Sequence, residues 1–193
     1  MPNLSDYKVL NFFMSHVELE IDLTKTPVQV KSKLTITPNP KANEPSTELV
    51  LDGQNMQLTS VSINGKTLPI TEYTLNEHAL ILKNVPQSTQ FSVETTTLLR
   101  ENTDLFGLYE TEGTVLVKAE TEGLRRVFFC IDRPDNLATY RTTVIANHHT
   151  HPVLLSNGDL IKREELEDGI QCVTWFDKVP KPSYLHLSNL RKN

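Results

Sequence analysis

Two short segments of the sequence carry the side chains best suited to chemistry. The first is His148-His149-Thr150-His151, where three imidazoles could bind zinc or copper. These histidines stand between two apolar runs that predict strands, and adjacent side chains in a connecting loop point in different directions. We therefore favour a solvated hairpin loop over a metal site, and expect the chain to bind no zinc.

The second segment runs from Lys118 to Arg126 and contains two glutamates. If it is an extended strand, Lys118, Glu120 and Glu122 share one face, because alternate side chains of a strand point the same way. Charges placed directly before Gly123 and an apolar run could line a cleft. The alternative is a solvated strand edge with ordinary surface ion pairs, and composition alone favours it.

Several other kinds of chemistry are not indicated by the sequence. It contains no H-E-x-x-H zinc motif, no G-x-S-x-G nucleophile elbow and no phosphate-binding loop. Cys130 lies within an apolar run, which is typical of a buried thiol and not of a nucleophile. The two cysteines and the net charge of -5 argue against a disulfide scaffold and against nucleic-acid binding. No apolar stretch approaches a membrane span and no signal peptide is recognisable, so we expect a soluble cytoplasmic protein.

The elements that must position these residues are predicted to be strands. Apolar and charged residues alternate over residues 17–23 and again over 28–36, which predicts an antiparallel hairpin across residues 24–27. Asn64-Gly65 is a second, two-residue hairpin signal. Further strands are expected over residues 47–51, 57–63, 78–82, 90–98, 115–117, 127–131, 140–146 and 170–176, with a single helical turn at 164–166.

This pattern predicts an all-β fold, an antiparallel β sandwich or saddle. No linker or repeat divides the chain, so residues 1–193 are expected to form a single β domain. Its core should span about residues 7–187. The polar segment 188–193 is expected to be a frayed tail.

Residues 120–135, with the sequence ETEGLRRVFFCIDRPD, resemble the signature of the aminopeptidase N family of gluzincin zinc aminopeptidases. The bacterial alanyl aminopeptidase branch is the most similar. Three further segments match that branch in the same order, namely LFGLY at 105–109, LLSNG at 154–158 and KPSYL at 181–185. The resemblance therefore covers about residues 17–185.

The resemblance implies a saddle-shaped N-terminal domain that packs over a catalytic domain. It also implies that Glu120 holds the α-ammonium group of the substrate and that Glu122 is structural. Arg125 is expected to pair within the corner, the change of chain direction at Gly123 before the apolar run. The family has a glutamine two residues before the glutamate, and this chain has Lys118. A lysine on the same face would pair with Glu120 and repel an incoming amine, so we expect peptide N-termini to bind weakly if at all.

The zinc-binding helix, the distal glutamate ligand and the G-x-M-E-N strand of the family are not in this sequence. The resemblance thus implies a noncatalytic substrate-binding domain that is not an enzyme alone and holds no cofactor, the zinc belonging to the catalytic domain. A separate catalytic domain or another protein is the expected partner. The alternative is a stand-alone protein–protein interaction module. Because the interface with the catalytic domain is uncovered, the surface near Glu120 should be more apolar than an ordinary monomer surface, and a uniformly charged surface there would instead indicate adaptation to a solitary chain.

Overall fold

The computed structural model describes residues 7–42 and 46–191, and β-strands dominate it. Helical residues in this part of the chain occur only in short 3-10 turns: η2 (Ile70–Glu72), η3 (Leu124–Arg126), η4 (Glu167–Gly169) and η5 (Ser183–Leu185). The expected all-β fold is confirmed. Consequently, no described helix has the length and apolar content needed to cross a membrane.

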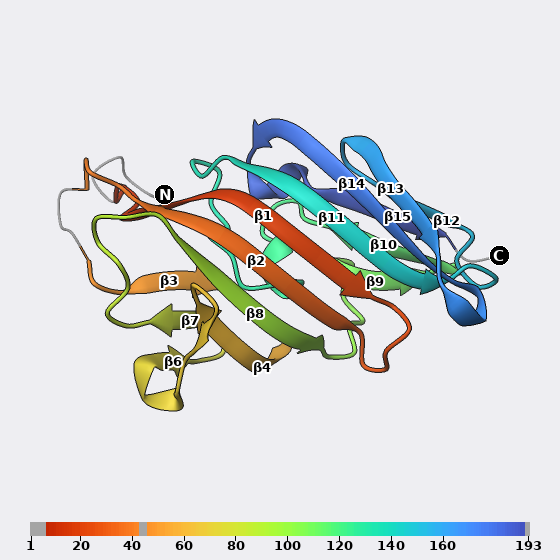
Figure 1. Cartoon of the computed structure of the whole chain (residues 1–193), viewed down its shortest axis with the longest axis horizontal. Helices are drawn as coiled ribbons and strands as arrows, with labels where there is room; N and C mark the ends of the chain where they lie inside the picture. The colour runs from red at the N-terminus through yellow and green to blue at the C-terminus, as the bar shows by residue number, and fades with distance from the viewer. Residues whose placement is uncertain (1–6, 43–45, 192–193) are drawn as a thin grey trace.

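One large sheet of eight strands forms one layer of the fold and faces the viewer in Figure 1. Its strand order is β13-β14-β11-β1-β2-β8-β4-β5. The bounds are β1 (Phe12–Asp22), β2 (Gln29–Pro38), β4 (Met56–Ile63), β5 (Lys66–Thr67), β8 (Phe91–Leu99), β11 (Ala138–Asn147), β13 (Asp159–Glu165) and β14 (Ile170–Lys181).

Both hairpins predicted from the sequence are present in this sheet. β1 and β2 pair antiparallel across residues 24–27, with Asp22 opposite Gln29. β4 and β5 pair across Asn64 and Gly65, whose φ values of 50° and 77° suit a tight hairpin turn. The exception to the antiparallel pattern is β1 with β11, which run parallel.

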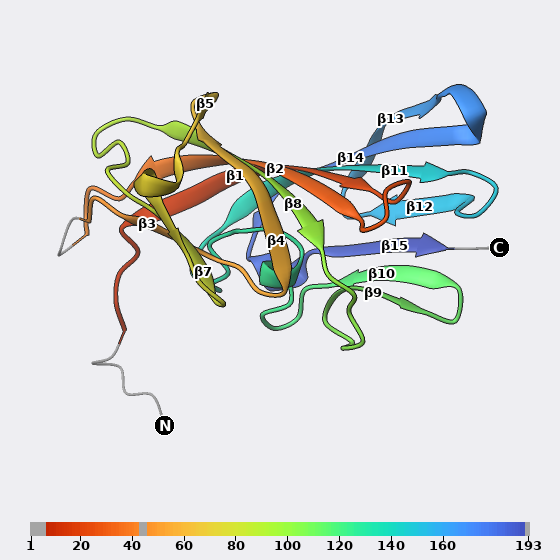
Figure 2. The same cartoon turned by 90° about the horizontal axis from the view of Figure 1, so that it is seen from below.

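Two smaller sheets form the lower layer (Figure 2). One has the order β12-β15-β10-β9, and the other has the order β3-β7-β6. The bounds are β12 (Val153–Ser156), β15 (Leu187–Arg191), β10 (Thr114–Lys118), β9 (Gly107–Thr111), β3 (Leu49–Asp52), β7 (Ala79–Leu82) and β6 (Tyr73–Leu75).

The position of β15 corrects the expectation of a frayed tail at 188–193. β15 is an inner strand, hydrogen-bonded to β12 on one side and to β10 on the other. Ser188 and Leu190 are buried, so the inward-facing side of β15 is part of the core of the domain. Residues 192–193 lie outside the described part. The polar composition was misleading because only alternate side chains of this strand face inward.

Two hydrophobic clusters fill the space between the layers. The larger one joins β1, β2, β4 and β8 to the β3-β7 pair and includes the fully buried Phe128. The smaller one packs β10, β12 and β15 against β11 and β14 through residues such as Leu154, Val173 and Leu190. Each layer thus buries one face and leaves the other in water, which explains the period-two pattern of the sequence.

Two predicted elements were wrong. Residues 127–131 do not form a strand. They follow η3 as an irregular, fully buried segment whose only ladder contact is the bridge between Asp52 and Cys130. Its apolar run reflects burial on all sides, which periodicity does not distinguish from a buried strand. The helical turn expected at 164–166 occurs later as η4, since β13 extends to Glu165.

A buried polar cluster lies where β11 and β14 approach the C-terminal segment. The ring of His186 lies 5.2 Å from the ring of Tyr140, centroid to centroid, and its side chain is almost fully buried. Burial lowers the pKa of His186 to about 4, against the raising effect of Asp177. Asp177 is itself paired with Lys181, the other charged group that acts on the imidazole.

His186 makes the stability of the domain depend on pH. The folded state keeps this imidazole neutral down to a pH of about 4, whereas an unfolded histidine binds its proton near pH 6.5. The free energy of unfolding should therefore fall as the pH drops through this window, by an amount on the order of 3 kcal/mol. Urea unfolding at several pH values measures it.

The matched variants are His186→Phe and His78→Gln, the second at an exposed histidine. His186→Phe should flatten the pH dependence between 4 and 6.5, and His78→Gln should retain it. The same pH dependence in wild type and His186→Phe would contradict this assignment.

Candidate functional site

Glu120 lies on a tight turn directly after β10. The strand ends at Lys118, and residues 120–123 form the turn, so Glu120 and Lys118 do not share a strand face as the sequence predicted. The Gly123 N–H donates a hydrogen bond of 2.8 Å to the Ala119 carbonyl and closes the turn. Ala119 is buried and Glu120 is exposed. The turn therefore presents the carboxylate to solvent from a fixed backbone.

Glycine is required at position 123 by close packing. A Cβ atom there would lie 2.1 Å from the Lys118 carbonyl oxygen and 3.1 Å from the Gly107 nitrogen. The backbone of the turn thus lies directly against the end of β10 and the start of β9. This contact limits the positions that Glu120 can adopt.

Lys118 contacts an aromatic ring. Its ammonium nitrogen lies 5.6 Å from the centroid of the Phe106 ring, within the range of a cation–π interaction. The guanidinium carbon of Arg126 lies 6.0 Å from the same centroid, and Arg126 Nη1 contacts Asp104 Oδ2 at 2.6 Å. In the described residues no ion pair joins Lys118 to Glu120, so the pair expected from the sequence is not formed.

Arg125 pairs within the corner, as the resemblance implied. Its backbone N–H and its Nε donate to Asp132 Oδ2 at 3.2 and 2.9 Å, and its Nη2 donates to the Asp132 carbonyl at 3.0 Å. Glu122 Oε1 lies 3.4 Å from Arg125 Nη2. The two glutamates of the segment therefore differ, since Glu122 takes part in the corner and Glu120 does not.

Buried Asp132 links this corner to two distant segments. Its N–H donates to Asp52 Oδ2 at 3.0 Å, and Ser183 Oγ donates to its Oδ1 at 2.5 Å. Burial raises the pKa of Asp52, while the Asp132 N–H and the Arg125 guanidinium act to lower it. The sequence indicated none of these partners, because they lie 51 and 80 residues away along the chain.

The segment after the corner, residues 127–131, is hydrogen-bonded to the end of β3. Asp52 and Cys130 exchange two backbone hydrogen bonds of 2.8 and 3.1 Å, and the Gln54 N–H donates to the Arg125 carbonyl at 2.8 Å. Gly53 leaves room for Phe129, whose Cδ1 would lie 2.1 Å from a Cβ at that position. Cys130 is fully buried, and burial raises the pKa of its thiol well above the usual value, so its expected role as a buried hydrophobe is confirmed.

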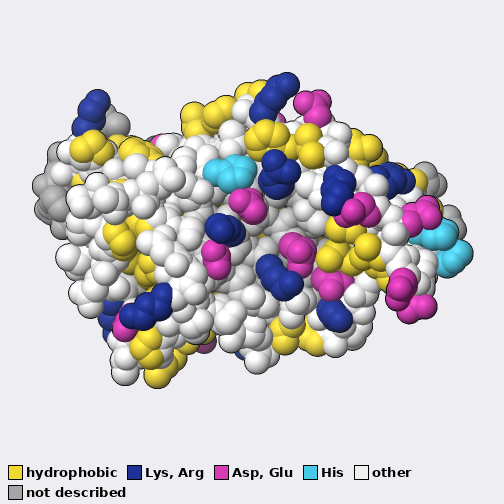
Figure 3. All heavy atoms as spheres, viewed as in Figure 1, with side chains coloured by type: hydrophobic (Ala, Val, Ile, Leu, Met, Phe, Trp, Pro, Cys, Tyr) yellow, Lys and Arg dark blue, Asp and Glu magenta, His cyan; other side chains and the backbone are white. Residues whose placement is uncertain are grey.

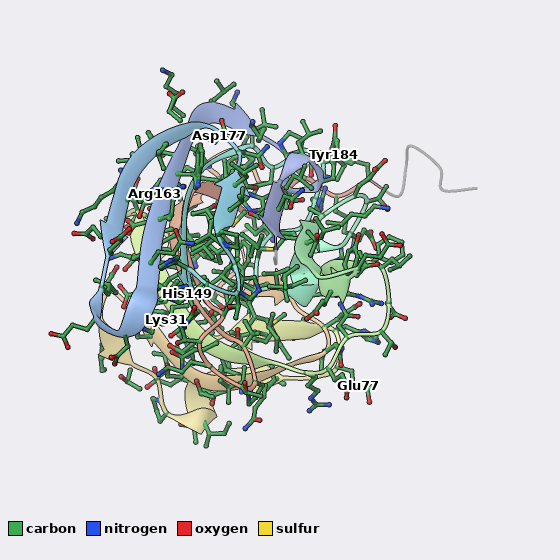
Figure 4. The ribbon with its side chains drawn as sticks, turned by 90° about the vertical axis from the view of Figure 1, so that its right-hand side faces the viewer. Lys31, Glu77, His149, Arg163, Asp177 and Tyr184 are labelled. Carbon is green, nitrogen blue, oxygen red and sulfur yellow. The ribbon has the colours of Figure 1, made fainter. Side chains whose placement is uncertain are left out.

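The histidine segment is a loop, although not a hairpin. It connects β11 to β12, which belong to different sheets, and His149 lies at the end of the molecule seen in Figure 4. The rings of His148 and His149 stack with centroids 3.9 Å apart, and His151 is buried with its Nδ1 3.0 Å from Thr150 Oγ1. Across residues 7–42 and 46–191, no three His, Cys, Asp or Glu side chains are placed to hold a metal ion.

A row of charged side chains crosses the outer face of the large sheet. On the large sheet, Arg141, Glu18, Lys33 and Glu94 stand opposite one another on four neighbouring strands and alternate in charge (Figure 3). They line a shallow hollow of about 410 Å³. Such a face is solvated and held together by cross-strand ion pairs, including Lys33 with Glu94 at 3.2 Å.

The sheet β12-β15-β10-β9 carries exposed apolar side chains. Leu187 is the register partner of Lys118 and is 53% exposed, and Phe106 beside them is 44% exposed. Leu155 and Val153 on β12 are also exposed. We call Phe106, Val153, Leu155 and Leu187 the apolar face; of these, Phe106 and Leu187 lie beside Lys118, two residues before Glu120.

Loss of Asp132 should destabilise the domain strongly. Asp132→Ala removes the carboxylate that accepts from Arg125 Nε and from the buried Ser183 hydroxyl, which we expect to cost about 3–5 kcal/mol of unfolding free energy. Asp135→Ala is the matched control, because Asp135 pairs with Arg133 in a partly exposed position and its loss should cost about 1 kcal/mol or less. Urea unfolding measures both, and equal losses would show that Asp132 has no special role.

Comparison with known proteins identifies the family of this fold and site. Residues 6–185 match the family described as the peptidase M1 N-terminal domain. Aminopeptidase N of Haemophilus influenzae is 38% identical over 183 residues, 93% of this chain and 20% of its own length. Aminopeptidase N of Escherichia coli is 33% identical over 180 residues, with 93% and 20% covered.

A solved structure gives the same result. Legionella pneumophila aminopeptidase A in complex with aspartic acid superposes with a TM-score of 0.96 at 58% identity, over 98% of this chain and 22% of that one. The chain thus spans about a fifth of the length of the curated relatives that it matches. On these grounds, the chain belongs to the peptidase M1 N-terminal domain family.

Proposed function

We propose that this domain holds the free amino terminus of a peptide at Glu120, as the noncatalytic substrate-binding part of a zinc aminopeptidase. A carboxylate at a fixed position favours a charged α-ammonium group over an acylated one. It thereby sets the distance from the amino terminus to the bond that is cleaved. Membership of the peptidase M1 N-terminal domain family supports this role.

The observation that carries the proposal is the availability of the Glu120 carboxylate. Within the described part of the chain, no hydrogen bond or ion pair engages it, whereas Glu122 contacts Arg125 at 3.4 Å. The backbone that carries Glu120 is nevertheless closed by the bond from Gly123 to Ala119. Because the backbone of the turn is already held, binding an amine has to order only the Glu120 side chain.

The apolar face supports a partner domain. The relatives are about five times as long as this chain, and we propose that a catalytic domain carrying the zinc docks on the face formed by Phe106, Val153, Leu155 and Leu187. Docking there would bring the Glu120 turn next to the reacting bond. The same face is the support for the alternative function, a stand-alone protein–protein interaction module.

Two further features of the proposal concern ligand and location. The Legionella relative was solved with aspartic acid, and we propose the same ligand class for this domain, an amino acid or peptide whose first residue is acidic.

Both cysteines are free thiols, which supports a reducing compartment, and we propose a cytoplasmic location.

The test is an NMR titration of the 193-residue chain with Ala-Ala-amide. We expect shifts at the Glu120 turn in the wild type, and a several-fold weaker affinity for Glu120→Gln, because an exposed charge pair contributes up to about 1 kcal/mol. Glu122→Gln is the matched control and should bind as the wild type does.

N-acetyl-Ala-Ala-amide supplies the second control, since it lacks the ammonium group. It should leave the Glu120 turn unshifted. If the acetylated peptide binds as well as the free amine, or if Glu120→Gln binds as well as the wild type, the proposed amine site is wrong.

A further inference from the structure

We infer that the hollow on the outer face of the large sheet binds a free α-amino acid, with Glu18 holding its ammonium group and Arg141 its carboxylate. The hollow lies over β1, β2, β8 and β11 and has a volume of about 410 Å³. This volume is within the range of small-molecule sites, about 300–1,000 Å³. The inference is independent of the role proposed for Glu120, which follows β10 in a different sheet.

Most of the charged side chains in the hollow neutralise one another. Three carboxylates and three cations line it. Lys31 Nζ lies 2.9 Å from Glu20 Oε1, and Lys33 Nζ lies 3.2 Å from Glu94 Oε1. These two cross-strand pairs leave one carboxylate and one cation of the hollow to be accounted for.

The remaining two groups, Glu18 and Arg141, are neighbours that do not pair. They are register partners on the parallel strands β1 and β11, so their side chains leave the same face from strands about 5 Å apart. Among residues 7–42 and 46–191, no ion pair engages either side chain. The hollow therefore offers one negative and one positive group at adjacent positions.

An aromatic contact holds the guanidinium of Arg141. Its central carbon lies 5.0 Å from the centroid of the Phe176 ring, and Phe176 is its register partner on β14. The His16 ring packs edge-on against the same Phe176 ring, with centroids 6.1 Å apart. An arginine placed over an aromatic ring keeps the N–H donors at its edge, in a fork that matches a carboxylate. The contact also limits the side-chain freedom that binding has to remove.

A free α-amino acid complements this arrangement. It carries an ammonium group and a carboxylate on the same carbon atom, so it can bridge two opposite charges that do not reach each other. The ammonium group would donate to Glu18, and the Arg141 guanidinium would donate to the carboxylate. Lys33 is the register partner of Glu18 on β2, and its pair with Glu94 leaves Glu18 available for the amine.

The test is an NMR titration of the 193-residue chain, read at the backbone amides of β1 and β11. The four probes are free alanine, alanine amide without a carboxylate, N-acetylalanine without an amine, and Ala-Ala, whose charges are farther apart. Glu18→Gln and Arg141→Gln each remove one charge of the site. The double variant Glu20→Gln/Lys31→Gln is the matched control, because it removes a complete ion pair from the same hollow.

We expect free alanine to shift these amides and to bind more tightly than the other three probes. Glu18→Gln and Arg141→Gln should each weaken alanine binding by about two- to fivefold, the range of an exposed ion pair. The double variant and Glu120→Gln should bind as the wild type does. Raised salt should weaken binding, because both contacts are charge pairs near the surface.

Every other outcome overturns the inference in a recognisable way. Absence of shifts at β1 and β11, or an unchanged affinity in Glu18→Gln or in Arg141→Gln, removes the two-point site and leaves the proposed function standing. Equal weakening in the double variant shows a general attraction of charges. Binding of Ala-Ala as tight as that of alanine shows a peptide site in place of an amino-acid site. Loss of the alanine shifts in Glu120→Gln shows that they report the Glu120 turn.

Discussion

The buried carboxylate of Asp132 is the interaction on which the arrangement of this domain depends. The carboxylate accepts hydrogen bonds from Arg125 at the corner and from Ser183 near the C-terminal strand. The backbone N–H of Asp132 donates to the Asp52 carboxylate at the end of β3. Three segments that lie far apart along the chain, namely β3, η3 and η5, are thereby joined at one point. Because the groups are buried, removal of one partner would leave the others without compensation.

The strands were predictable from the sequence where the signal is local. Alternation over residues 17–36 and the Asn64-Gly65 turn specify hairpins from neighbouring residues, and both hairpins are present. The buried nature of Cys130 followed from its apolar neighbours. Glu120 was found through its motif, and its anchoring role stays a prediction.

The features that the sequence did not predict depend on distant partners. The parallel pairing of β1 with β11 joins segments more than a hundred residues apart. β15 is ordered because β10 and β12 flank it, which its polar composition does not indicate. Lys118 and Glu120 lie on different elements because β10 ends at Lys118 and a turn follows. The contact of Lys118 with Phe106 depends on the pairing of β9 with β10.

The central claim is that the Asp132 corner fixes the turn that presents Glu120. Amide hydrogen exchange at Gly123 and Arg125 tests it most directly, because these N–H groups donate to Ala119 and Asp132. Both should exchange slowly in the wild type, with protection close to that of the surrounding strands, and both should become fast in Asp132→Asn while β1 and β2 stay protected. Exchange of Gly123 at the rate of an open loop in the wild type would contradict the account.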